Sequence, residues 1–185
     1  VEQDHLRVTQ QGRGQGEDLD PLKLPTRLQT ALQALYGHYE KTFKLWDEYG
    51  IKVPPCFIIV CQNTAISKLV YDFISGFERT NDDGTSELVN GRHELFRNYD
   101  ENNFPLAQPR TLLIDSAQLE SGDALDDNFR KAAKDEIERF RRDRVERSGN
   151  QGDGDNIPDE DLLREVMNTV GKHGRLGEQV RCVVS

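Results

Sequence analysis

Three runs of apolar residues constrain most strongly what this chain of 185 residues can fold into. They lie at 56–61, 111–116 and 180–185, and the first is apolar throughout, without alternation. Such a run is typical of a strand buried on both faces, as in a parallel sheet. Parallel strands are joined by crossover connections, usually helices. The runs therefore predict an α/β layered domain with a mainly parallel sheet and right-handed crossovers.

Between these runs, apolar residues recur at helical spacing. We expect helices over 25–49, 64–77, 124–147 and 158–170, which gives the order helix, strand, helix, strand, helix, helix, strand. The first helix has the most aromatic face, and we interpret it as a core-packing helix, with a nucleic-acid stacking platform as the alternative. Its apolar stripe comprises Leu28, Ala31, Leu32, Leu35, Tyr36, Tyr39, Phe43, Trp46 and Tyr49.

Other stretches lack apolar periodicity. Residues 1–24 are predicted to be a flexible lead-in, and flexible loops are expected near 78–110 and 148–158. A short hairpin is predicted around Leu88 and Val89, because turn residues flank them. The run at 180–185 would end the chain inside a strand, so we expect the sequence to be a piece of a larger protein.

Composition excludes some classes of protein. The formal net charge of −9 argues against a surface given over wholly to nucleic acid, though a local basic groove stays possible. No apolar run approaches the ~20 residues that span a bilayer. The three cysteines, Cys56, Cys61 and Cys182, lie in apolar runs, which predicts buried, reduced thiols in a cytoplasmic protein. Cysteine and histidine show no zinc spacing, so no metal site is expected.

Polar residues follow two of the predicted strands. Because ligands of open parallel sheets bind beyond the carboxyl ends of the strands, Gln62, Asn63 and Thr64 form one candidate site, and Asp115 with Ser116 forms another. Asn63 or Thr64 can cap the next helix, and the exposed N–H groups there suit a phosphate. Lys68, one turn further on, could add a positive charge. The alternative is that Asn63 and Thr64 are only helix caps.

Two catalytic alternatives are weaker. Asp115 ends a strand as the magnesium-binding acid of a Walker B segment does, but the chain has no Gly-x-x-x-x-Gly-Lys-Ser/Thr loop to cradle a phosphate. Asp115 is more simply interpreted as an acid that holds a loop. Cys61 precedes a helix N-terminus, where the pKa of a thiol can fall. No histidine has a recognisable partnering role, so we interpret Cys61 as structural.

The residues at 54–71 resemble the motif IV segment of the restriction subunit of type III restriction-modification enzymes, which belong to the superfamily 2 helicases. The stretches 111–122 and 166–172 resemble the same family. So does 176–185, which is similar to the approach to motif V. The resemblance extends from about residue 24 to residue 185.

The resemblance implies that residues 25–185 are part of a second RecA-like motor domain, a three-layer fold of the P-loop NTPase kind that is incomplete here. In this family the motif IV turn contacts the DNA backbone, a role that falls on Gln62, Asn63 and Thr64. The implied partners are DNA, the first RecA-like domain and the nuclease domain of the same chain, and a modification methyltransferase subunit. ATP and Mg²⁺ are implied for the parent enzyme. Because phosphoryl transfer needs motifs that this chain lacks, we expect no ATP hydrolysis by the chain alone.

Two other functions compete with a part of a DNA translocase motor. One is a free-standing α/β regulatory domain that binds a small phosphorylated ligand at the turn of Asn63 and Thr64. The other is a thiol-dependent transferase that uses Cys61.

Overall fold

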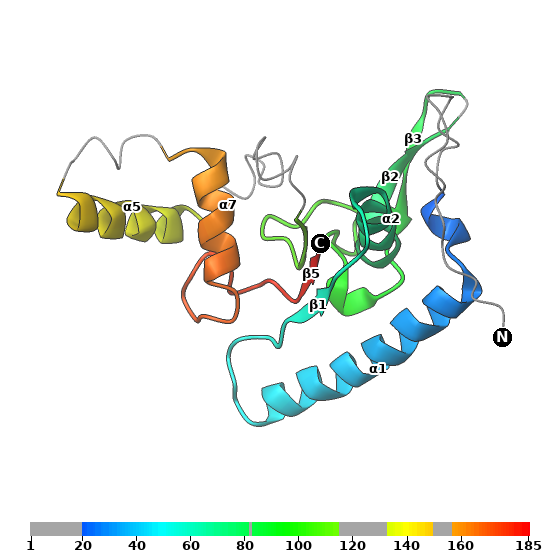
Figure 1. The fold of residues 1–185 in the computed structure, drawn as a ribbon, viewed down its shortest axis with the longest axis horizontal. Coiled ribbons are helices and arrows are strands. Elements are labelled where there is room, and N and C mark those ends of the chain that lie inside the picture. The colour runs from blue at the N-terminus through cyan, green and yellow to red at the C-terminus, as the bar shows by residue number, and fades with distance from the viewer. Residues whose placement is uncertain (1–19, 82, 115–132, 150–156) are drawn as a thin grey trace.

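The computed structural model describes residues 20–81, 83–114, 133–149 and 157–185. Figure 1 shows helices on both sides of a small central sheet, with a hairpin projecting from one side. In chain order the elements are η1 (Pro21–Lys23), α1 (Thr26–Glu48), β1 (Phe57–Ile59), α2 (Thr64–Ser75), β2 (Gly76–Thr80), β3 (Ser86–Asn90), η2 (Glu94–Phe96), β4 (Thr111–Leu113), α5 (Lys134–Ser148), α7 (Asp159–Asn168) and β5 (Cys182–Val184).

The central sheet has three strands in the order β1-β5-β4, and both pairings are parallel. Phe57 of β1 and Thr111 of β4 both lie opposite Cys182 of β5. The strand that comes last in the chain therefore occupies the middle of the sheet. The sequence-based prediction of a mixed α/β fold with a parallel sheet flanked by helices is confirmed.

One face of the sheet packs against α1 and α2. Leu113, Cys182 and Val184 belong to this core, and Leu24, the residue after η1, is also buried in it. Aromatic rings fill the space between the helices and the sheet: the ring centroids of Tyr39 and Phe96 are 4.6 Å apart. The buried helix residues are Leu32, Tyr36 and Tyr39 of α1 and Val70, Phe73 and Ile74 of α2. Leu24 ends the stretch expected to be a lead-in, and residues 1–19 lie outside the described residues.

The opposite face packs against α5 and α7 through aliphatic side chains. Leu112 and Ile114 belong to this second core together with residues of both helices. The helix residues are Ile137 of α5 and Leu162, Leu163 and Val166 of α7. The helix predicted at 158–170 is present as α7, and its apolar residues Leu162, Leu163 and Val166 are fully buried. Of the helix predicted at 124–147, α5 forms the second half, and residues 124–132 lie outside the described residues.

The prediction that the run at 56–61 is buried on both faces is wrong. Ile58 and Val60 are 65% and 79% exposed, whereas Phe57 and Ile59 pack into the core beside α1 and α2. The reason is that β1 lies at the edge of the sheet. Helices α5 and α7 pack against β4 and β5, and they do not cover the side chains of Ile58 and Val60 on the same face of the sheet. Cys56 is exposed too, Cys61 is half-buried and Cys182 is buried, so the prediction of buried thiols fails for Cys56.

The apolar stripe of α1 is narrower than predicted. Leu32, Tyr36 and Tyr39 are buried, but Leu35 is 49% and Tyr49 is 77% exposed. Successive residues turn by 100° in a helix, so a stripe this wide cannot face one flat sheet along its whole width. Leu35 flanks the buried face, and Tyr49 follows the last helical residue as the C-cap.

The hairpin predicted around Leu88 and Val89 is present and longer than expected. β2 and β3 pair in antiparallel fashion from Gly76 opposite Asn90 to Thr80 opposite Ser86. Asp83 stabilises the connecting turn, because its carboxylate accepts hydrogen bonds from the N–H and the hydroxyl of Thr85. Within the part of the chain that the structure describes, no helix is long and apolar enough to cross a membrane.

Candidate functional site

The turn between β1 and α2 is built around Asn63. This residue has an extended backbone, with φ −159° and ψ 165°, and its side-chain oxygen accepts a hydrogen bond of 3.0 Å from the N–H of Ile66. Its carbonyl accepts the N–H and the hydroxyl of Ser67, each at 3.0 Å. Of the two candidate caps, Asn63 is therefore the N-cap, and Thr64 is the first helical residue.

The start of α2 is open to a ligand. Gln62, Asn63, Thr64 and Ala65 are all exposed. The first N–H groups of a helix have no partner within the helix, and Asn63 satisfies the N–H group of Ile66. The N–H groups of Thr64 and Ala65, together with the positive end of the helix dipole, are available to an anion or to water.

The carboxyl end of β5 lies directly beside this turn. The N–H of Cys61 donates a hydrogen bond of 2.6 Å to the carbonyl of Ser185, and the N–H of Ser185 donates one of 2.9 Å to the carbonyl of Ile59. Ser185 is exposed. Two segments that are far apart in the sequence thus form one edge of the sheet next to Asn63.

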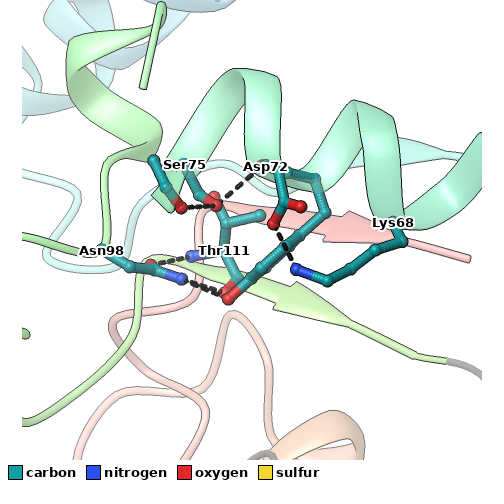
Figure 2. A network of polar contacts seen from close by, with 7 residues as sticks. Lys68, Asp72, Ser75, Asn98 and Thr111 are labelled. Atoms are coloured by element: carbon teal, nitrogen blue, oxygen red, sulfur yellow. Dashed lines mark hydrogen bonds and ion pairs between the residues drawn. The ribbon is translucent and has the colours of Figure 1, made fainter. Parts of the chain in front are cut away.

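The structure does not bring Lys68 to the turn. Its ammonium group forms an ion pair of 2.5 Å with Asp72, one turn further along α2, as Figure 2 shows. The carboxyl group of Asp72 is largely buried, and this burial raises its pKa while Lys68 opposes the rise. Lys68 therefore balances a desolvated carboxylate and points away from the exposed N–H groups.

Cys61 has the environment of a structural thiol. Its side chain is half-buried, and this burial raises the pKa of the thiol, although a hydrogen bond with Ser67 acts in the opposite direction. A raised pKa leaves less thiolate at neutral pH, and the thiolate is the nucleophile. The geometry gives no support to a thiol-dependent transferase.

The second candidate site cannot be described in the same way. Asp115 and Ser116 lie outside the described residues. The residue before them, Ile114, is held to the middle strand by a hydrogen bond of 2.8 Å from its N–H to the carbonyl of Val184.

The side chain of Asn98 joins α2 to the start of β4 through four hydrogen bonds, and we call this cluster the polar hub. It was not predicted from the sequence. Asn98 donates from its amide to the hydroxyl of Tyr71 at 2.9 Å and to the carbonyl of Thr111 at 2.8 Å. Its side-chain oxygen accepts the N–H groups of Arg110 and Thr111, both at 2.9 Å. Figure 2 shows Asn98 between the end of α2 and the start of β4. A single asparagine in a turn-rich loop has no periodicity, so no signal in the sequence marks it.

The backbone of Asn98 extends the same hub. Its N–H donates a hydrogen bond of 3.0 Å to the carbonyl of Ser75, the last residue of α2. Its carbonyl accepts the N–H of Leu106 at 2.7 Å. Asn98 therefore fixes where α2 ends relative to the sheet, and this position also determines where the Asn63 turn lies.

In the described ranges, no group of three or more His, Cys, Asp or Glu side chains could hold a metal ion. No family model, curated protein or solved structure matches the chain. The fold and the site together define a mixed α/β protein with a helix-capping, anion-accessible turn at the carboxyl end of its parallel sheet.

Proposed function

We propose that this chain is part of the second RecA-like motor domain of an ATP-dependent DNA helicase or translocase, similar to the restriction subunit of type III enzymes. The hydrogen bond from Cys61 to Ser185 carries the proposal. It joins the segment that resembles motif IV to the segment that resembles the approach to motif V. A motor domain needs both segments at one edge of its sheet, where the DNA passes.

The proposed contact is to the DNA backbone through the turn of Gln62, Asn63 and Thr64. A helix N-terminus with free N–H groups binds phosphate without a cation. Contacts of this kind position a protein on a duplex and carry no information about the base sequence. Sequence recognition would fall to a partner, the modification methyltransferase subunit.

In this proposal ATP and Mg²⁺ bind between this domain and a first RecA-like domain, and a nuclease domain completes the enzyme. Residues 1–185 contain no Walker A loop. The contribution of this chain would be to grip DNA and to move relative to the other domain.

Nuclear magnetic resonance with the 185-residue chain tests the proposal. Two unrelated 20-base-pair duplexes are titrated separately into the labelled protein, and inorganic phosphate is titrated in parallel. We expect both duplexes to shift the amide signals of Thr64 and Ala65. Thr64→Ala keeps the backbone N–H groups and the Asn63 cap and removes only the exposed hydroxyl group of Thr64, so it should weaken the binding of both duplexes equally, by about 1 kcal/mol, the value of one neutral hydrogen bond from that hydroxyl group to a phosphate. The slope of affinity against salt should not change, because no cation is lost.

Thr42→Ala is the matched control. Thr42 is a half-buried residue of α1, and its hydroxyl donates to the carbonyl of His38 within the helix. This variant should bind DNA like the parent chain. If phosphate shifts the amides of the turn and neither duplex does, the regulatory domain for a small phosphorylated ligand replaces the motor. If neither the duplexes nor phosphate shift the amide signals of Thr64 and Ala65, and Thr64→Ala binds DNA like the parent chain, the turn is only a helix start capped by Asn63.

A further inference from the structure

Two adjoining grooves on the α5–α7 layer carry a basic surface. The larger, of about 720 Å³, lies between the second half of α5, α7 and residues 172–175. The smaller, of about 420 Å³, shares Asp143 and Arg175 with it. We call the two grooves together the α5–α7 basic surface, and its cationic residues are Arg139, Arg142, Arg144, Arg147, Lys172 and Arg175.

The charge of this surface is opposite to that of the chain. Six cations face four carboxylates, whereas the whole chain has 24 Lys and Arg against 33 Asp and Glu. His173 also lines the smaller groove. A local positive excess on an acidic protein attracts a polyanion to one place and repels it elsewhere. The four carboxylates are Asp143, Glu146, Asp161 and Glu165.

Two ion pairs join the elements that line this surface. Arg144 of α5 pairs with Asp161 of α7 at 2.6 Å, and Arg175 pairs with Asp143 of α5 at 3.1 Å. A guanidinium group of Arg139 also donates to the carbonyl of Gly174 at 3.1 Å. These contacts tie the two helices and the loop before β5 together, so the grooves are pre-formed.

Arg147 and Lys172 are the cations of the larger groove that these contacts leave available. Both are exposed and line the larger groove, and neither forms an ion pair with any residue that the structure describes. Exposed side chains without a carboxylate partner can reach an incoming phosphate without breaking an existing contact. They are therefore the residues on which binding would depend most.

The shape of the surface favours an extended ligand. Arg139 and Arg147 are eight residues apart on α5, a span of about 12 Å at the helical rise. One strand of B-DNA presents a phosphate about every 3.4 Å along its axis, so a helix that lies along the DNA axis would span about four successive phosphates over this distance. A single small anion would use only part of this surface.

The basic surface is separate from the Asn63 turn. Residues 172–175 precede β5 and lie toward the amino ends of the parallel strands, whereas Asn63 follows the carboxyl end of β1. The turn offers N–H groups and its nearby cation, Lys68, is paired with Asp72. The two regions therefore present different chemistry to a ligand.

We propose that the α5–α7 basic surface binds the phosphate backbone of duplex DNA at a second site, through Arg147 and Lys172. The inference rests on the proposed function only in its choice of DNA as the polyanion. This site supplies the charge-dependent part of the affinity, because each phosphate neutralised by a cation releases counterions. The turn has no free side-chain cation, so it contributes little to the dependence of affinity on salt.

The test compares two double variants of the full chain. Arg147→Ala/Lys172→Ala removes the two available cations, and Arg164→Ala/Lys41→Ala removes the same charge elsewhere. Arg164 lies on α7 outside both grooves and pairs with Glu160, and Lys41 lies exposed on α1. Fluorescence anisotropy with a labelled 20-base-pair duplex is measured from 50 to 200 mM salt, and circular dichroism checks that each variant melts like the parent.

We expect Arg147→Ala/Lys172→Ala to bind about tenfold more weakly at 0.1 M salt and to lower the slope of log affinity against log salt by about two units. The control variant Arg164→Ala/Lys41→Ala should keep both the affinity and the salt slope of the parent chain. An unchanged slope in the first variant, or an equal loss in both variants, overturns the inference. Binding to vesicles of anionic phospholipid without binding to the duplex overturns it as well.

Thr64→Ala and the amide shifts of the turn separate this inference from the proposed function. If the groove variant loses DNA while the turn does not respond to DNA, the second site stands and the motif IV contact fails. If DNA shifts the amide signals of the turn and Arg147→Ala/Lys172→Ala keeps the salt slope of the parent chain, the contact at the turn stands and the second site fails.

Discussion

The two helical layers of this protein differ in how they are built. The α1–α2 layer meets the sheet through aromatic rings and reaches all three strands, including Phe57 and Ile59 of the edge strand. The α5–α7 layer meets it through aliphatic side chains and leaves Ile58 and Val60 uncovered. The first layer also has the polar hub at Asn98, which joins α2 to β4. In the second layer the buried hydroxyl of Thr169 accepts the N–H of Gly177, and a half-buried ion pair between Arg144 and Asp161 joins α5 to α7.

This difference indicates a division of roles between the two layers. Aromatic packing and a satisfied polar hub specify one arrangement of α1, α2 and β4, and they position the Asn63 turn. Exposed ion pairs contribute little to stability, typically below about 1 kcal/mol each. The ion pairs of the α5–α7 layer therefore contribute less to the stability of the fold than the packing of the α1–α2 layer does.

The largest expected effect comes from one glycine in each layer. A Cβ atom on Gly91 would lie 2.2 Å from the carbonyl oxygen of Ile74 in α2, and one on Gly177 would lie 2.2 Å from that of Val166 in α7. Gly91→Ala and Gly177→Ala should each reduce the free energy of unfolding by about 3 kcal/mol, because a backbone must move. Urea unfolding measures both.

Gly37→Ala is the control, because no atom lies within 4 Å of its Cβ position and Gly37 is inside α1. It should stabilise the protein by about 1 kcal/mol through helix propensity. If Gly177→Ala produces a second, earlier transition while Gly91→Ala shifts a single one, the two layers unfold separately. Unchanged midpoints in both variants would contradict the close contacts.

Acid should weaken the α1–α2 layer through His93. This side chain is 2% exposed, stacks on Tyr36 with ring centroids 4.4 Å apart, and has no hydrogen bond to either ring nitrogen among the described residues. Burial, with a smaller contribution from Arg92, lowers the pKa of His93 to about 4. The folded state therefore keeps the imidazole neutral where the unfolded chain, with a pKa near 6.5, binds a proton.

Stability from His93 is thus present above pH 6.5 and is lost as the pH falls towards 4. We expect a loss of up to about 3 kcal/mol across this window, at 1.36 kcal/mol per pKa unit. Urea unfolding at several pH values measures it, and His93→Leu should flatten the profile. If the variant keeps the same acid dependence, other groups are responsible.

Removal of the polar hub should have a somewhat smaller effect. Asn98→Ala deletes four side-chain hydrogen bonds, and we expect a loss of about 2 kcal/mol, since water replaces some of the partners of this half-buried residue. Asn98→Asp keeps the acceptor for Arg110 and Thr111 and loses the donors, so it should be intermediate. Thermal melting compares them, and an Asn98→Ala variant as stable as the parent would show that the hub only orders the loop.

Local patterns predicted much of the fold. The apolar runs predicted β1, β4 and β5, and the helical spacing of apolar residues at 158–170 predicted α7. Asn63 was one of two predicted caps, because a cap depends on a side chain and an N–H group only three residues apart. These features arise from contacts between neighbours in the sequence, so the sequence contains the signal for them.

The amino-acid sequence by itself determined the class of fold, the strands and the capped turn after β1. Only the tertiary structure decided which strand lies at the edge, and therefore that Ile58 and Val60 are exposed. It also decided that Lys68 pairs with Asp72, that Asn98 joins α2 to β4, and that Arg147 and Lys172 lie in one groove. The physical reason is that strand order and side-chain partners depend on contacts between distant segments, and hydrophobic periodicity does not record them.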